Sequence, residues 1–114
     1  MKILAPNLYK IILTNKNMRT SSRNLYIIKG SERSLMIDTS WNVPECLSEM
    51  EQALNELSID CRDLDIFVTH NHVDHSGYVS FFTDRGARAF MNPVEIAASS
   101  DRFHRFYEDN YMRR

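Results

Sequence analysis

The stretch Thr69-His70-Asn71-His72-Val73-Asp74-His75-Ser76-Gly77 decides how the rest of this sequence is interpreted. It holds three of the chain's four histidines within six consecutive residues, together with an aspartate. Residues 64–69, just before the histidines, are mostly branched, aromatic or apolar, which predicts a short buried strand. His70 and His72 are two residues apart, and an extended backbone places side chains of that spacing on the same side.

Three imidazoles and a carboxylate gathered at the end of a strand are the ligands that a divalent metal such as zinc requires. His70, His72, Asp74 and His75 are therefore the candidate metal ligands. The alternative is a polar surface loop whose histidines bond to backbone or water. We favour the metal site because four side chains of ligand type occur in this order.

The string resembles the His-x-His-x-Asp-His signature of the metallo-β-lactamase superfamily, whose members are mostly hydrolases with one or two metals. The resemblance implies that His70 and His72 hold one metal, and that Asp74 and His75 hold the second. Two departures are Ser40 and Tyr78, which stand where glycines are common in the family. Both positions are in loops, so neither departure removes a ligand.

A second match lies upstream, in residues 24–30 and 34–39, which look like the family's paired strands ending in an Asp-Thr-Gly-like element. The resemblance implies that Asp38 is a polar support for the metal ligands. The alternative is an ordinary Asx turn, in which Asp38 caps the backbone of Thr39 and Ser40.

The resemblance implies an α/β fold, the N-terminal half of an αββα sandwich with a mixed sheet and helices outside. We expect one partial domain over residues 1–114, with the sheet and metal motif in 1–92 and a C-terminal helix in 93–114. The family completes its site with ligands much later in the chain, whereas this sequence ends at Arg114. The remaining histidine, His104, is far from the motif and is not expected to bind metal.

The inner face of such a half-sandwich is apolar and normally finds a partner. We therefore expect either a missing C-terminal half or self-association to cover the sheet. Hydrophobic periodicity places the elements in order. It predicts strands at residues 8–14, from residue 24, at 34–37, 64–69 and 87–91, and helices at 44–57, 77–82 and 94–114. For the last helix, packing or oligomer contact is favoured over a lid across the active site.

Composition narrows the class of protein further. With 14 basic and 15 acidic residues the formal charge is −1, which gives no electrostatic footprint for nucleic acid. The sequence contains no apolar run of membrane-spanning length and no secretory pattern at the N-terminus. Cys46 and Cys61 lack metal-site spacing, and a buried free thiol is the default for Cys46. We expect a cytoplasmic protein without membrane or nucleic-acid partners.

The chemistry implied by the resemblance is hydrolysis of a small-molecule ester, thioester or lactam by a metal-bound hydroxide. Two divalent metal ions are expected, with zinc the default and iron or manganese compatible with the same ligands. Asp74 is also the candidate catalytic residue, because it is placed to accept or relay a proton. As an N-terminal fragment, the chain is expected to be inactive alone.

Two other functions remain open. One is an iron-dependent oxidoreductase of the same superfamily, although its flavoprotein branch typically has a glutamate where His72 stands. The other is a non-catalytic metal-binding or assembly module that keeps the motif, binds metal weakly and forms a stable oligomer through the uncovered sheet.

Overall fold

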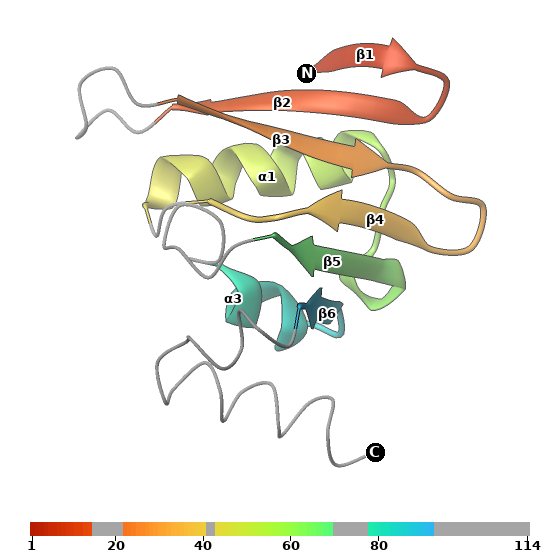
Figure 1. The fold of residues 1–114 in the computed structure, drawn as a ribbon, viewed down its shortest axis with the longest axis vertical. Helices are drawn as coiled ribbons and strands as arrows, with labels where there is room; N and C mark the ends of the chain where they lie inside the picture. Colours follow the sequence, from red (N-terminus) through yellow and green to blue (C-terminus); the bar gives the residue numbers. More distant parts are fainter. Residues whose placement is uncertain (15–21, 41–42, 70–77, 93–114) are drawn as a thin grey trace.

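The computed structural model describes residues 1–14, 22–40, 43–69 and 78–92, which form a six-stranded mixed sheet with helices on one face (Figure 1). The strands lie side by side in chain order. The pairs β1–β2, β2–β3 and β3–β4 are antiparallel, whereas β5 and β6 run parallel to β4. Their bounds are β1 (Lys2–Ala5), β2 (Leu8–Thr14), β3 (Ser22–Ile28), β4 (Ser34–Ile37), β5 (Leu64–Val68) and β6 (Arg88–Met91).

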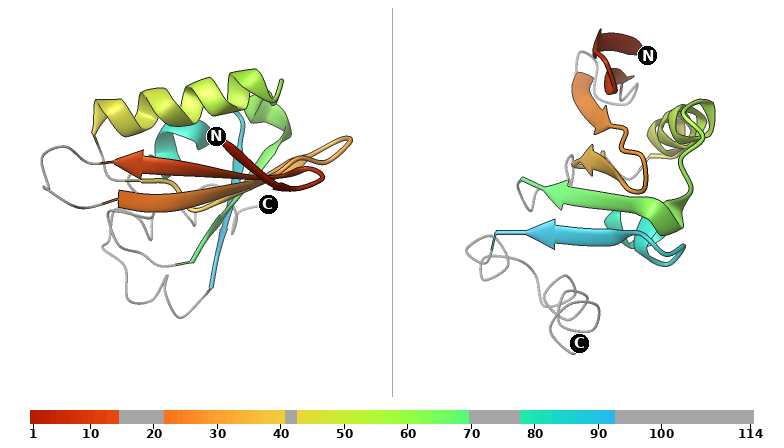
Figure 2. Two further views of the ribbon diagram at one scale, coloured as in Figure 1. Left: turned by 90° about the horizontal axis from the view of Figure 1, so that it is seen from above. Right: turned by 90° about the vertical axis from the view of Figure 1, so that its right-hand side faces the viewer.

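The helices provide the connections between the parallel strands. α1 (Pro44–Glu56) joins β4 to β5 through the short 3₁₀ helix η1 (Cys61–Asp63), and α3 (Val79–Thr83) precedes β6. Figure 2 shows α1 and α3 on the same side of the sheet. α1 begins with a proline, whose fixed φ suits the first helical turn. No helix in the described part of the chain is long and apolar enough to cross a membrane.

The core lies between the sheet and these helices. In β3, Leu25 and Ile27 are fully buried while Ile28 is exposed, as expected for a strand covered on one face. Met50 and Leu54 of α1 face the same interior. The described core also contains Ile11, Leu13, Met36, Leu64, Ile66, Val68, Val79, Phe82, Ala89 and Met91.

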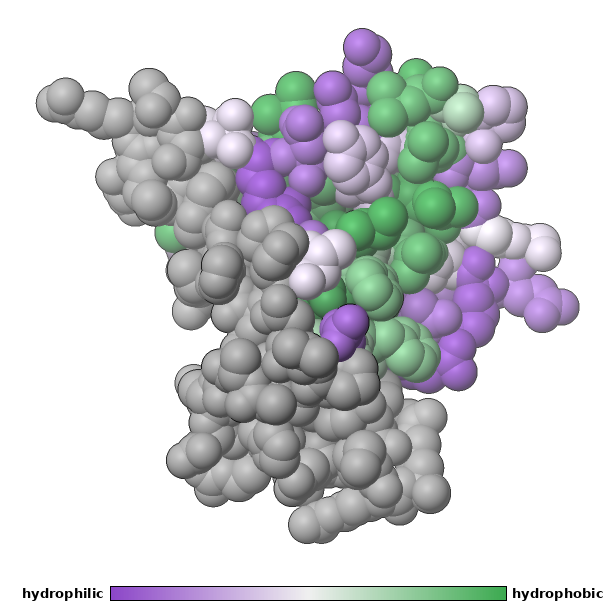
Figure 3. Space-filling model, viewed as in Figure 1, coloured by the Kyte–Doolittle hydropathy of each residue, from purple (hydrophilic) through white to green (hydrophobic). Residues whose placement is uncertain are grey.

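The opposite face of the sheet is apolar and exposed. The solvent-exposed fractions of Ile12, Phe67 and Phe90 are 57%, 43% and 43%. Ile37, Phe67 and Phe90 are paired in register across β4, β5 and β6, so they form one row. Figure 3, which views this face, shows apolar residues gathered at its centre. We call it the open face.

Most of the predicted elements are confirmed, and the fold class is the α/β arrangement that the resemblance implies. β3 begins at Ser22, before the predicted start at residue 24. Sequence patterns do not predict β1, because its four residues are all exposed and show no alternation of buried and exposed positions. The predicted helix at 94–114 lies outside the described residues.

A half-exposed cluster of charges holds the beginning of β5. Asp65 accepts hydrogen bonds from Arg33 Nη2 at 2.7 Å and from Arg88 Nε at 2.9 Å. Arg33 also donates to the carbonyls of Arg62 and Leu64. Burial acts to raise the pKa of Asp65, but the hydrogen bonds from Arg88 and Arg33 outweigh it, so the pKa lies below its ordinary value.

This cluster predicts a loss of stability in acid. Because the Asp65 pKa is lower in the folded state, its stabilisation is complete above about pH 4, the ordinary range of an unfolded aspartate, and is lost as pH falls through the folded pKa. Asp65→Asn should therefore have a lower urea midpoint than the wild type at pH 6, with the difference shrinking toward pH 3. As a control, Asp60→Asn should change the midpoint little, since Asp60 pairs with Arg62 at the surface. A difference for Asp65→Asn that is independent of pH would contradict this account.

Candidate metal centre

The carboxyl ends of the parallel strands β4, β5 and β6 meet at one edge of the sheet. Asp38 follows β4, and Thr69 follows β5. In open α/β sheets, ligands bind at this edge of the strands. The sequence motif begins at His70, directly after Thr69, so the fold delivers the motif to this edge.

The four predicted metal ligands, His70, His72, Asp74 and His75, lie outside the described residues, in the interval 70–77. Their roles therefore stay predictions. His104 lies in the interval 93–114, which is also not described. What the structure describes is the scaffold on either side of the motif.

Asp38 is the most constrained residue of this scaffold. It is buried, with 3% of its surface exposed, and its φ is 68°, in the left-handed region that non-glycine residues seldom adopt. Its backbone N–H donates to the Phe67 carbonyl at 2.8 Å, which ties the end of β4 to β5. Such strain persists only where the surroundings over-determine a conformation, and it is concentrated at functional sites.

The Asp38 carboxylate reaches across to the end of β5. Its Oδ1 accepts the Thr69 backbone N–H at 2.6 Å, and its Oδ2 accepts the Thr69 hydroxyl at 2.6 Å. Oδ2 also accepts Arg23 Nη2 at 2.7 Å, in an ion pair whose side chains are 10% and 4% exposed. One carboxylate thus fixes both the backbone and the side chain of the residue that precedes His70.

Thr39 holds the other side of the motif. It is fully buried, and its hydroxyl oxygen accepts the backbone N–H of Tyr78 at 3.2 Å. Tyr78 is the first residue after the interval 70–77. Two consecutive residues, Asp38 and Thr39, therefore anchor the chain on both sides of the predicted metal loop.

Sequence reasoning found Asp38 but missed Arg23, Thr69 and Tyr78 as parts of this scaffold. A signal for Arg23 was present. Alternate residues of a strand point to the same face, and Leu25 and Ile27 of β3 are buried against the helices. Arg23 precedes Leu25 by two residues, so it lies on the same helix-covered face. An arginine on a core-facing strand position needs a carboxylate partner.

The donor set of the predicted centre, three imidazoles and one carboxylate, suits zinc, iron or manganese. Among the described residues alone, no group of three or more His, Cys, Asp or Glu side chains is placed to hold a metal ion. Both oxygens of Asp38 already accept hydrogen bonds from Thr69, and one also accepts from Arg23. Asp38 is therefore suited to support ligands.

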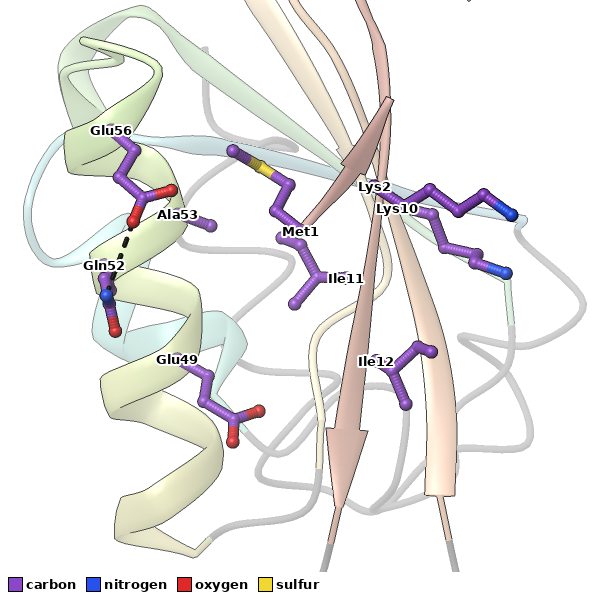
Figure 4. Close-up of a pocket in the computed structure, with 9 residues that line it drawn as sticks. All are labelled: Met1, Lys2, Lys10, Ile11, Ile12, Glu49, Gln52, Ala53 and Glu56. Carbon is purple, nitrogen blue, oxygen red and sulfur yellow. Dashed lines mark hydrogen bonds between the residues drawn. The ribbon is translucent and has the colours of Figure 1, made fainter. Parts of the chain in front are cut away.

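A separate hollow of about 350 Å³ lies between α1 and the β1–β2 edge of the sheet (Figure 4). Ile11 and Ala53 contribute its apolar wall, and Glu49, Gln52 and Glu56 line the side of α1. Neither Asp38 nor Thr39 lines it. This hollow is therefore not part of the candidate metal centre.

Comparison with solved structures identifies the class of fold. The chain matches a metallo-beta-lactamase family protein from Thermus thermophilus with a TM-score of 0.74 and 31% identity, over 96% of this chain and 35% of that one. It matches FIM-1 from Pseudomonas aeruginosa, solved in a mono-zinc form, with a TM-score of 0.68 and 17% identity, over 85% and 43%. It matches a metallo-beta-lactamase from Hirschia baltica with a TM-score of 0.69 and 18% identity, over 90% of this chain and 47% of that one.

These likenesses confirm the resemblance to the metallo-β-lactamase superfamily: the chain has the fold of part of such a domain. No protein-family model matches the sequence. The chain spans less than half the length of each of these three structures.

The geometry of Asp38 gives a direct prediction. Asp38→Asn keeps the size of the side chain and its tolerance of positive φ but removes the charge that faces the buried Arg23. We expect the free energy of unfolding to fall by about 3 kcal/mol, because breaking a buried ion pair leaves an uncompensated charge. Urea denaturation at pH 7 measures the change.

The matched control is Asp84→Asn, at an exposed position after α3, which should lie within about 0.5 kcal/mol of the wild type. A loss below about 1 kcal/mol for Asp38→Asn would show that the Arg23–Asp38 contact does not behave as a buried pair.

Proposed function

We propose that the chain carries part of the active site of a metal-dependent hydrolase that acts on a small-molecule ester, thioester or lactam. The observation that carries the proposal is the contact of Asp38 with Thr69, because it anchors the residue immediately before the His-x-His-x-Asp-His string. A strained, buried carboxylate at the carboxyl edge of parallel strands is a costly feature, and a functional loop beside it accounts for that cost.

In this proposal His70 and His72 hold one divalent ion, and Asp74 and His75 hold a second. Asp74 also accepts or passes on a proton during the reaction. When bound, such ions lower the pKa of water toward neutrality and polarise the bond to be cleaved. Asp38 and Thr39 act through Thr69 and Tyr78, by fixing where the loop leaves β5 and where it returns.

Zinc is the proposed metal, and the substrate is a small molecule. The near-balanced charge of the sequence supports the absence of a nucleic-acid partner. The two cysteines, Cys46 and Cys61, are free thiols, which suits the reducing conditions of the cytoplasm. Because the chain spans 35% to 47% of the structures it resembles, the activity is proposed for the whole protein.

The ligand assignment can be tested on the 114-residue chain by calorimetric titration with Zn²⁺. His70→Ala and His72→Ala should each weaken binding by more than the roughly 10–100-fold that loss of a supporting residue costs. His104→Ala is the matched control and should bind as the wild type does. If both motif variants keep the full affinity for Zn²⁺, the site assignment is wrong.

Metal analysis of the purified chain distinguishes the hydrolase from the second function. Bound iron with redox activity would favour the iron-dependent oxidoreductase, since imidazole and carboxylate ligands accept iron as readily as zinc. Bound zinc without redox activity supports the hydrolase.

The third function, an assembly module, would use the open face as its surface of association. An apolar sheet face packs onto another sheet face about 10 Å away. A second copy of the chain presents the same row of Ile37, Phe67 and Phe90. We propose that the 114-residue chain self-associates through this face.

Sedimentation velocity tests this association. Phe67→Asp should shift the chain toward monomer with little change in its melting temperature, because Phe67 is 43% exposed in the single chain. Glu32→Ala, at an exposed position in the turn between β3 and β4, is the control and should leave the association unchanged. A wild-type chain that sediments as a monomer would exclude the assembly function.

A further inference from the structure

We propose that Arg23 is a positioning residue for the predicted metal loop: it fixes the Asp38 carboxylate and, through it, Thr69. The inference rests on the proposed function for the meaning of the loop, but its geometry is independent of any metal. Arg23 lies near the start of β3, whereas Thr69 follows β5. The contact therefore links two strands that are not neighbours in the sheet.

The Arg23 guanidinium is held from two directions. Its Nη1 donates to the Asn24 carbonyl at 2.7 Å, which anchors it to the backbone of its own strand. Its Nη2 donates to Asp38 Oδ2 at 2.7 Å. Because the guanidinium is planar and its donors have a fixed geometry, the first bond determines where the second donor points.

Asp38 needs such a partner to hold one orientation. The torsion that turns a carboxylate about its last bond is broad, so the side chain alone does not fix where the two oxygens lie. Thr69 donates one hydrogen bond to each oxygen, from its N–H to Oδ1 and from its hydroxyl to Oδ2. Arg23, bound to Oδ2, keeps the plane of the carboxylate in the orientation that satisfies both.

The consequence is local. Loss of Arg23 frees the Asp38 carboxylate to rotate, and the bonds to Thr69 weaken before the core of the sheet is affected. The chain offers a matched control in Arg33, which bonds Asp65 and the Leu64 carbonyl at the opposite end of β5. Loss of Arg33 also removes an arginine–aspartate contact from β5, but not at the start of the motif.

The experiment is amide hydrogen exchange by NMR on the full 114-residue chain without metal, with Arg23→Met and Arg33→Met compared with the wild type. Ile66, in the middle of β5, reports the stability of the sheet. In Arg23→Met, exchange at Thr69 should accelerate by about tenfold more than exchange at Ile66, as expected for losing a bond to a charged acceptor. In Arg33→Met the two amides should change together.

Arg23→Lys keeps the charge but not the planar fork, and it should give a smaller acceleration at Thr69 than Arg23→Met. If Arg23→Met does not fold, Arg23→Lys decides the question by the same comparison. If exchange at Thr69 in Arg23→Met accelerates by the same factor as exchange at Ile66, the proposal is overturned.

A second readout connects the positioning to the metal. Calorimetric titration with Zn²⁺ should show an affinity reduced by about tenfold in Arg23→Met and unchanged in Arg33→Met. A reduction of about tenfold is the effect expected for losing a residue that orients metal ligands without binding the metal itself. If the wild type binds no Zn²⁺ while Thr69 responds to Arg23, the proposed function fails and the positioning role stands. If Zn²⁺ binds equally to the wild type and Arg23→Met, Arg23 does not position the ligands.

Discussion

The carboxylate of Asp38 is the interaction on which the candidate site depends. It is buried, and burying a charge is costly unless the charge is paired and hydrogen-bonded. Here the donors come from Arg23 on β3 and from Thr69 after β5. Satisfying one carboxylate therefore fixes the relative positions of three parts of the chain, and the last of them leads into the histidine motif.

The topology of the sheet makes this contact possible. β4 and β5 are parallel neighbours, so the helix α1 must return the chain to the starting edge before β5 begins. Both strands then end at the same edge, where Asp38 and Thr69 meet. The apolar face of α1 packs against the sheet and holds this arrangement in place. The geometry of the site therefore depends on the packing of the core.

Much of this arrangement was predictable from local patterns. The largely apolar run in residues 8–14 and the 3.6-residue spacing in 44–57 predicted a strand and a helix that the structure confirms. The histidine string identified the motif and pointed to Asp38. Local patterns carry no information about partners distant in sequence, so the pairing of Arg23 with Asp38 required the fold. The four ligands themselves lie outside the described residues and stay predictions.

The strand that leads to the motif is held at both ends by arginine and aspartate, but in different surroundings. At its start, Asp65 and its two arginines are partly exposed to water, where ion pairs contribute modest stability that depends on pH and salt. At its end, the Arg23–Asp38 pair is buried, where the desolvation of two charges offsets most of their attraction. Replacing a buried ion pair by apolar residues of similar volume is often neutral or stabilising. The main consequence of the buried pair is therefore geometrical: it orients a carboxylate whose oxygens hold Thr69, one residue before His70.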